Sequence, residues 1–391
     1  MPRFNPRVAA LAPPPIPSVF AWAKDYDGSQ GPLIDFSQAV PGYPAHPDML
    51  RWLGEAAAST ASSGYGPIEG EAGLRAAYAT HVAALYGADV TAGNIHITAG
   101  CNQAFIVTMM ALAGAGDTVL VTNPFYFNHE TTLTMLGIDV DLVPCDQTTG
   151  FLPDLGALKE ALTPKVRALA LVTPNNPTGA IYPPDLLEDI FSLCKANGTW
   201  LVLDETYRDF LPGGEAPHAL FSRDGWQDTL IGLYSFSKSF CVPGHRLGAI
   251  TASPAAVAEI AKVMDNVQIC APRAGQIALE KALPALDDWR ADNRAEIVRR
   301  ADALKVVMAD VPDWSIQAIG AYFAYIRHPY ADIDSAFVAE KLAKLAGIIC
   351  LPGDFFGAGQ DAYLRFAFAN AGVEVIDQLR ERLRTFVLPG I

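Results

Sequence analysis

The chain lacks the long apolar segments that would place it in or across a membrane. None of its 391 residues belongs to an apolar run of the roughly 18 residues that a spanning helix requires. The proline-rich start, Met1–Pro17, also lacks the apolar core of a secretory signal. We therefore expect no membrane partner.

Basic residues are scarce. The sequence has 28 Lys and Arg residues against 42 Asp and Glu residues, which gives a formal net charge of -14. An excess of negative charge disfavours nonspecific binding to the phosphate backbone of nucleic acids. We therefore expect no nucleic-acid partner.

The cysteines show no pattern that would indicate a disulfide framework or a metal site. The six cysteines have no C-x-x-C pair and no histidine group nearby; they are Cys101, Cys145, Cys194, Cys241, Cys270 and Cys350. Scattered thiols of this kind are typical of a reducing compartment. We expect a cytoplasmic protein without a bound metal.

The middle of the chain alternates apolar segments of strand length with helix-like segments. We predict seven strands, at 94–98, 118–122, 139–143, 166–172, 200–204, 230–235 and 248–252. We predict helices at 102–113, 125–136, 155–162 and 184–197. Near-continuous apolar strands joined by helices indicate a mostly parallel sheet that is covered on both faces. The fold class is therefore α/β, with a large domain at 48–285.

The pattern of predicted elements changes after about residue 285, where strands and helices follow one another in a different order. Predicted helices at 287–308, 333–346 and 374–388 enclose strand-like segments at 347–351 and 364–370. This pattern indicates a smaller α+β domain at 286–391. The proline-rich residues 1–47 are expected to form an N-terminal arm and part of the small domain.

Lys238 lies in the apolar, serine-flanked run Ser235–Phe240 at the end of a predicted strand. An ammonium group removed from water is costly unless it is paired or loses its proton. A neutral lysine is a nucleophile that forms Schiff bases with carbonyl compounds. The two serines before Lys238 and Arg246 after it suit a phosphate. A phosphate-bearing aldehyde of this kind is pyridoxal 5'-phosphate (PLP).

Asp204 ends the apolar run Trp200–Leu203, and ligands of open α/β sheets bind at this end of the strands. A buried carboxylate needs a cation, and a protonated pyridine nitrogen would provide one. The alternative is that Asp204 caps the following helix. The single crossover unit between Asp204 and Lys238 favours the cofactor role.

Two further polar side chains are predicted to reach the phenolic oxygen of the cofactor ring. Asn176 follows a predicted strand in the run Asn175–Gly179, and Tyr207 follows Asp204. Donors at that oxygen would stabilise the phenolate. The alternative for Asn175–Gly179 is a simple turn.

The segment Thr98–Gln103 joins a predicted strand to a predicted helix, with Gly100 at the junction. Glycine permits a close backbone approach, and free N–H groups at the start of a helix bind phosphate. Cys101 and Asn102 would contribute such groups. The alternative for Cys101 is a reactive thiol.

Two tyrosines, Tyr126 and Tyr65, are also candidate cofactor contacts. Tyr126 begins a predicted helix after a strand, so it either stacks on the cofactor ring or packs in the core. Tyr65 lies in a glycine-rich loop at 63–70, which either offers the hydroxyl to a phosphate or is an ordinary surface loop.

Arg365 lies in the apolar segment Tyr363–Ala369, and a charge on an apolar strand implies a buried anion. The planar guanidinium group matches a carboxylate in bidentate fashion. Either a substrate carboxylate or an acidic side chain of the chain itself is the partner.

Taken together and in this order, these motifs resemble the class I/II aminotransferases of the PLP-dependent fold-type I superfamily, of which aspartate aminotransferase is an example. The resemblance runs from about residue 30 to the C-terminus. It implies catalytic roles for Lys238, Asp204 and Tyr207, with Lys238 as the Schiff-base lysine and proton shuttle.

The resemblance also implies the remaining contacts. The phosphate is expected against Gly100, Cys101, Asn102, Ser235, Ser237 and Arg246, the ring against Tyr126 and Asn176, and the substrate carboxylate on Arg365. Tyr65 is expected to reach the phosphate of a neighbouring subunit, which implies a homodimer with shared active sites.

One position departs from the family pattern. In the run Ser37–Pro44 the family commonly has a glycine where Ala39 stands, and the backbone there approaches the substrate carboxylate. Either the added methyl narrows the pocket, or the backbone serves unchanged. Asn176 and Ala39 are therefore included with Arg365 among the expected substrate contacts.

The expected reaction is the transfer of an amino group between an L-amino acid and a 2-oxo acid, in a ping-pong cycle. The sequence shows no clear second arginine for a side-chain carboxylate, which favours a neutral or aromatic amino acid. Other PLP reactions use the same residues, among them β-elimination as in C–S lyases, cyclisation and oxidative deamination. A ligand-sensing regulator on this fold is a remote alternative, because the acidic chain shows no DNA-binding module.

Overall fold

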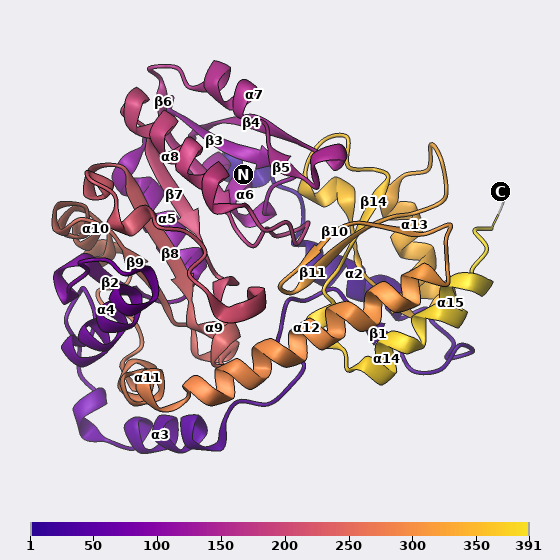
Figure 1. Cartoon of the computed structure of the whole chain (residues 1–391), viewed down its shortest axis with the longest axis horizontal. Coiled ribbons are helices and arrows are strands. Elements are labelled where there is room, and N and C mark those ends of the chain that lie inside the picture. Colours follow the sequence, from indigo (N-terminus) through magenta and orange to yellow (C-terminus); the bar gives the residue numbers. More distant parts are fainter. Residues whose placement is uncertain (1, 390–391) are drawn as a thin grey trace.

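The computed structural model describes residues 2–389 and contains a large α/β domain and a smaller domain (Figure 1). The main sheet has the strand order β2-β9-β8-β7-β6-β3-β4-β5. Its strands are β2 (Ile95–Thr98), β9 (Gly248–Thr251), β8 (Leu230–Ser235), β7 (Trp200–Asp204), β6 (Val166–Val172), β3 (Thr118–Asn123), β4 (Asp139–Asp146) and β5 (Leu152–Pro153).

The sheet is mostly parallel, as predicted, but it has eight strands rather than seven. All seven predicted strands form, and the short β5 pairs antiparallel with the end of β4 as an eighth. Strand β9 runs antiparallel to both β2 and β8. The two-residue strand β5 is too short for its hydrophobic pattern to distinguish it from a loop.

Helices cover both faces of the sheet, which explains why its strands are apolar throughout. Leu201 and Leu203 of β7 pack on one face, in a core shared with α4 (Ala72–Tyr86), α8 (Pro184–Asn197) and α11 (Arg273–Ala285). Val202 of the same strand faces the opposite side, in a core shared with α5 (Cys101–Leu112), α6 (Phe127–Leu136) and α10 (Pro254–Val267). Alternating side chains therefore fill two separate cores.

The small domain is built on an antiparallel sheet with the order β10-β11-β14-β13. These strands are β10 (Ser315–Gly320), β11 (Phe323–Arg327), β14 (Tyr363–Phe366) and β13 (Leu351–Pro352). Helix α12 (Asp287–Ala309) extends from the side of α11 to the small domain (Figure 1). The predicted helix 333–346 forms as α13 (Ser335–Lys341) followed by a π-helical turn, and 374–388 forms as α14 (Val373–Asp377) and α15 (Leu379–Thr385).

The N-terminal segment contains more structure than its proline content indicates. It forms α1 (Pro6–Ala9) and α2 (Pro15–Ala23), and each helix begins at a proline, where the missing N–H group costs nothing. The segment also supplies β1 (Ile34–Asp35), which pairs with β12 (Ile348–Ile349) of the small domain. Two further helices of the large domain are α3 (Pro47–Ala57) and α7 (Leu155–Ala161). The domain limits at 47/48 and 285/286 stay predictions.

Candidate active site

The ends of the central strands surround a cavity of about 180 Å³ at the carboxyl edge of the sheet. Its lining includes most of the site residues predicted from the sequence: Cys101, Asn102, Tyr126, Asn176, Asp204, Tyr207, Ser235, Ser237, Lys238 and Arg246. Val172, Thr206 and Pro243 complete the lining. Loops that follow parallel strands meet at this edge, which is why residues far apart in sequence converge here.

Lys238 lies on the one-turn helix α9 (Phe236–Ser239), directly after β8. Its Nζ donates a hydrogen bond to the carbonyl oxygen of Ala39. Burial, together with the positive charges of Arg246 and Arg365, lowers the pKa of Lys238 to about 8. A sizeable fraction of the amine is therefore neutral, and nucleophilic, at mildly alkaline pH.

Asp204 is buried at the end of β7, where it accepts hydrogen bonds from Thr206. Its Oδ2 also lies 3.4 Å from Nε2 of His129, a residue on α6. Burial alone would raise the pKa of Asp204, but His129 and Thr206 hold it below its ordinary value. The carboxylate is therefore ionised and can hold a cationic ring nitrogen in the cavity.

The predicted phosphate cup, Ser235, Ser237, Arg246 and the start of α5 at Cys101 and Asn102, lies together in the cavity lining. The first N–H groups of α5 have no acceptor within their own helix. The Ser237 hydroxyl is buried without a hydrogen-bond partner in residues 2–389. These unused donors converge with a guanidinium group, an arrangement that suits a dianion.

Gly100 makes room for the cup. A Cβ atom at this position would lie 2.1 Å from Nη2 of Arg246, and the backbone has a φ of +88° that side-chain-bearing residues rarely adopt. Glycine is therefore required both for the backbone conformation and for the approach of Arg246. The Cys101 thiol is buried, and burial raises its pKa, so it stays protonated and unreactive.

Arg365 and Ala39 do not line the cavity, but each is one hydrogen bond from a residue that does. Arg365 Nη1 donates to Asn176 Oδ1 at 2.9 Å, and its Nη2 donates to the Ser37 carbonyl. The side chain is 2% exposed, and its Nε has no partner in the described part of the chain. Burial lowers the pKa of Arg365 to about 10.

No carboxylate of residues 2–389 forms a salt bridge with Arg365. The rings of Phe323 and Phe356 flank the guanidinium group, with centroids 4.8 Å and 5.2 Å from its carbon. Among residues 2–389, therefore, no acidic side chain forms the structural ion pair with Arg365 that was the alternative. A buried, unneutralised guanidinium group at the edge of a cavity is suited to an incoming carboxylate.

Tyr126 and Tyr207 contribute two aromatic walls to the cavity. Tyr126 accepts a hydrogen bond from Asn128, and Tyr207 packs edge-on against Phe323 of the small domain. Tyr65 is the exception among the predicted residues, because its side chain is 81% exposed and does not line the cavity. Within one chain, therefore, Tyr65 is not brought to the site.

Sequence reasoning missed His129, Thr206 and Pro243. His129 is three residues after Tyr126, so both lie on the same side of one helical turn, and its ring stacks on Phe105 at 3.8 Å. Thr206 follows Asp204 by two residues, a spacing that lets an aspartate accept from a nearby backbone N–H. These spacings could have identified both residues.

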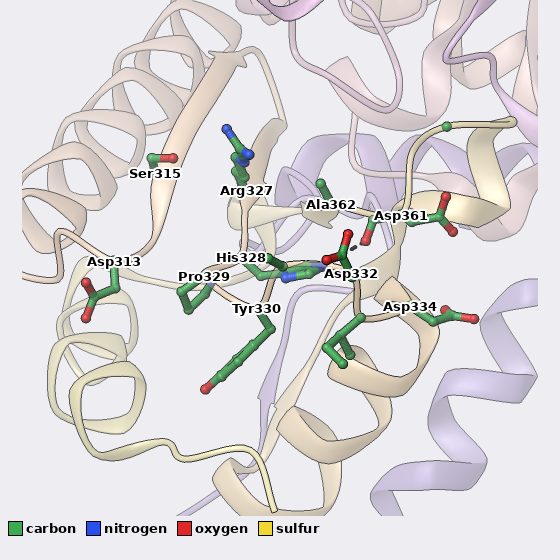
Figure 2. A pocket seen from close by; sticks show the side chains of 13 residues that line it. Asp313, Ser315, Arg327, His328, Pro329, Tyr330, Asp332, Asp334, Asp361 and Ala362 are labelled. Atoms are coloured by element: carbon green, nitrogen blue, oxygen red, sulfur yellow. Dashed lines mark hydrogen bonds between the residues drawn. The ribbon is translucent and has the colours of Figure 1, made fainter. Parts of the chain in front are cut away.

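A second, larger cavity of about 990 Å³ lies in the small domain, remote from these residues. Figure 2 shows side chains from the end of β11, the loop that follows it and the segment before β14. Asp334 caps α13, and Asp332 and Asp361 are exposed; the lining also contains the basic side chain of Arg327. The cavity contains none of the predicted site residues, and we take the cavity around Lys238 as the candidate active site.

Two further structural features concern membrane-spanning helices and metal-ligand groups. Among residues 2–389, no helix is long and apolar enough to cross a membrane. The same residues contain no group of three or more His, Cys, Asp or Glu side chains arranged around a metal position.

Comparisons with known proteins agree on one family. A sequence model described as "Aminotransferase class I and II" matches residues 26–383. The chain is 30% identical over 315 residues to the aromatic aminotransferase ISS1 of Arabidopsis thaliana, covering 79% of this chain and 78% of the relative. It is 26% identical over 380 residues to an aromatic-amino-acid aminotransferase 2 of Thermococcus litoralis, covering 96% of each.

The fold is also similar to that of solved structures. A double mutant of the aspartate aminotransferase from Thermus thermophilus superposes with a TM-score of 0.90 at 26% identity. The match covers 99% of this chain and 100% of the other.

Proposed function

The chain belongs to the class I and II aminotransferases, and on this premise we propose that it exchanges amino groups between a neutral or aromatic L-amino acid and a 2-oxo acid. The protein is a transaminase that uses PLP, as members of this family do. The observation that carries the proposal is the cavity that unites Lys238, Asp204 and the phosphate cup.

The residues of the cavity fit PLP group by group. The unpartnered Ser237 hydroxyl, Arg246 and the start of α5 suit the phosphate, and Gly100 leaves the space they need. Asp204 offers an ionised carboxylate to the ring nitrogen, and Tyr126 offers an aromatic face. When bound, PLP withdraws electrons from the substrate carbon next to the amino group.

Lys238 is the proposed nucleophile and proton carrier. Its lowered pKa lets Nζ accept the proton of the substrate α-carbon near the working pH of the enzyme. The Ala39 carbonyl oxygen accepts a hydrogen bond from Nζ and so fixes the position of the amine. One amine can thus serve both directions of proton transfer in a ping-pong cycle, in which the first 2-oxo acid leaves before the second binds.

Arg365 is the proposed anchor of the substrate carboxylate. Its donation to Asn176 orients the amide of that residue so that the Nδ2 group remains free for the phenolic oxygen of PLP. Tyr207 lines the same cavity and is the second donor proposed for that oxygen. Substrate and cofactor would therefore be held by linked side chains.

The preference for a neutral or aromatic substrate rests on charge. Lys238 and Arg246 are the basic side chains in the cavity lining among the described residues, and both have other proposed partners. The names of two relatives specify aromatic substrates, whereas the solved structure is an aspartate aminotransferase. Relatives of this family therefore differ in substrate, and the charge of the cavity favours the first kind.

The exposed Tyr65 supports a homodimer with shared active sites. An aromatic hydroxyl that is 81% exposed on its own subunit is available to the phosphate of a second copy. We propose this assembly together with a cytoplasmic location, which the six free thiols support. Sedimentation of the purified protein at twice the chain mass is the expected result, and a stable, active monomer would contradict it.

A panel of amino donors tests the function directly. The purified protein should carry a visible absorbance band from bound PLP, and the band should shift when a preferred donor converts PLP to pyridoxamine phosphate. Addition of a 2-oxo acid should restore it without release of ammonia. A wild-type protein that binds no PLP would overturn the proposal, ammonia release without an acceptor would indicate β-elimination, and activity with aspartate or glutamate alone would reverse the substrate preference.

A further inference from the structure

A largely buried ion pair, Asp209 with Arg290, lies outside the cavity around Lys238 and lines a separate one. Asp209 belongs to the short 3-10 turn Arg208–Phe210 that follows β7, and Arg290 lies in the first turns of α12. Arg290 Nη1 and Asp209 Oδ1 are 3.1 Å apart, and the two side chains are 9% and 12% exposed. Neither residue lines the cavity around Lys238, so a direct contact with cofactor or substrate is not their role.

The other carboxylate oxygen of Asp209, Oδ2, is connected to α9 through two hydrogen bonds. Tyr234 donates its hydroxyl proton to Asp209 Oδ2 at 2.6 Å, and the same hydroxyl oxygen lies 2.6 Å from Ser239 Oγ. Burial alone would raise the pKa of Asp209, but Arg290 and Arg208 hold it below its ordinary value. Because an ionised carboxylate cannot donate, Tyr234 donates to Asp209, and Ser239 must donate to Tyr234.

The pair also reaches the second residue after Lys238. The guanidinium carbon of Arg290 lies 5.3 Å from the centroid of the Phe240 ring. The ion pair therefore contacts both residues that follow Lys238. It reaches Ser239 through Tyr234, and Arg290 packs on Phe240 directly. Helix α9 is a single turn of four residues, and a helix of that length is not stable by its own hydrogen bonds.

We propose that Asp209 and Arg290 are positioning residues for Lys238. They act through a chain of contacts, from Asp209 to Tyr234 and Ser239 and from Arg290 to Phe240, and they tie the first turns of α12 to the helix that carries the lysine. Arg290 belongs to the helix that leads into the small domain, where Arg365 lies. The placement of Lys238 is thereby linked to α12, the helix that connects the large domain with Lys238 to the small domain with Arg365. The inference rests on the proposed role of Lys238.

Tyr234→Phe is the main test, because it removes the middle of the chain and leaves the ion pair intact. Tyr86→Phe is the matched control. Tyr86 is also a buried tyrosine that donates to a carboxylate, at 2.6 Å to Glu205 Oε1, but its hydroxyl contacts no residue of α9. The two variants remove the same group from similar surroundings, so a loss of thermal stability common to both measures the structural cost alone.

The readout is made on protein stripped of cofactor. The rate at which Lys238 captures PLP is followed by visible absorbance, and the affinity for pyridoxamine phosphate, which has no aldehyde, is measured by calorimetry. Tyr234→Phe should slow capture by about tenfold, because small displacements of a reacting group cost rate steeply. Its affinity for pyridoxamine phosphate should be unchanged, and Tyr86→Phe should capture PLP at the wild-type rate.

Ser239→Ala keeps the proposal testable if Tyr234→Phe does not fold. It should also slow capture by about tenfold, and the double variant should be no slower than either single one, because contacts of one chain are not additive. Equal losses of capture and of pyridoxamine phosphate affinity, or a wild-type capture rate in Ser239→Ala, would overturn the inference. A wild-type protein that captures no PLP would instead overturn the proposed role of Lys238.

Discussion

Lys238 and Arg365 are both cations that the fold withdraws from water, but the two domains treat them differently. In the large domain, burial and neighbouring positive charges bring the pKa of Lys238 to about 8, close enough to neutrality for the amine to lose its proton. In the small domain, burial brings the pKa of Arg365 only to about 10, so the guanidinium group stays charged. One region thus contains an amine that can lose its proton near neutral pH, and the other keeps a permanent positive charge.

The surroundings of the two side chains match this difference. Lys238 lies at the end of a strand in a cavity with an ionised carboxylate and unused donors. Arg365 lies within a strand between two phenylalanine rings, and its hydrogen bonds go to a carbonyl and an amide oxygen. Burial alone does not set the role of a cation. The ordinary pKa of the group decides whether burial leaves it charged or able to lose its proton.

The largest effect should come from removing the proton acceptor. Lys238→Ala should lower the rate of transamination by about 10⁴-fold, because a positioned acid–base group contributes up to that amount. The variant should also lose the visible band of bound PLP. Steady-state kinetics and absorbance spectra measure both.

Lys262→Ala is the control for Lys238→Ala. Lys262 is an exposed lysine on α10 that pairs with Glu259 at 2.6 Å, and its loss should leave the rate unchanged. Transamination at more than a tenth of the wild-type rate in Lys238→Ala would show that the lysine is not the proton acceptor.

Removal of the permanent charge should affect binding rather than the cofactor. Arg365→Ala should raise the KM for amino acids by about 100-fold, since a buried charge contact is worth about 3 kcal/mol. The affinity for PLP should fall far less, because the phosphate cup and Asp204 are intact and only the hydrogen bond that orients Asn176 is lost. Titrations with amino acid and with PLP separate the two effects.

Arg327→Ala is the control on the neighbouring strand, because Arg327 is exposed at the end of β11, beside Tyr363 of β14. It should change neither affinity. Equal weakening of amino-acid and PLP binding in Arg365→Ala would assign Arg365 a structural role instead.

The pH dependence should distinguish the two cations in one experiment. PLP capture by the cofactor-free protein should rise about tenfold per pH unit below the Lys238 pKa of about 8 and level off above it, because only the neutral amine reacts. In Arg365→Ala the profile should move to higher pH, since the loss of a nearby positive charge favours the protonated lysine. A capture rate that still rises steeply beyond pH 10 would show that the lysine is not perturbed.

The smallest effect is expected at the boundary between the two regions. Ala39→Gly removes a methyl group beside the carbonyl that holds Lys238, and it should change the KM for bulky donors by less than about tenfold, the lower end of what a methylene-sized change contributes. A panel of small and aromatic amino acids measures the change. If the KM of Ala39→Gly equals the wild-type KM for every donor, the methyl group of Ala39 does not face the substrate.

The two regions also differ in how far their residues could be predicted from the sequence. The large-domain residues follow strand ends in chain order, and each local motif indicates its position relative to the sheet. The local motifs marked Asp204, Lys238 and the start of α5 as strand-end residues, the resemblance to the family implied that they share one site, and in the structure they line one cavity. His129 was missed because its contact with Asp204 joins helix α6 to the end of β7, two elements far apart in the chain, although its spacing from Tyr126 placed it on the same helical turn.

The small-domain side depends on packing between segments far apart in the chain. Arg365 was identified as a buried cation, but its bonds to Ser37 and Asn176 require the N-terminal segment and the large domain to meet at β14. The short strand β5 and the helices of the N-terminal segment were missed for a different reason. Segments of two to nine residues carry too few side chains for a period to be distinguished.

The unneutralised charge of Arg365 has a consequence for the stability of the folded chain. A guanidinium group that has left water without gaining a counter-ion weakens the folded state, and any carboxylate that binds there strengthens it through mass action. The melting temperature of the protein should therefore rise with the concentration of each amino acid or oxo acid that fits. If Arg365 is the proposed carboxylate anchor, the shift in melting temperature should rank amino acids and oxo acids by how well each binds there.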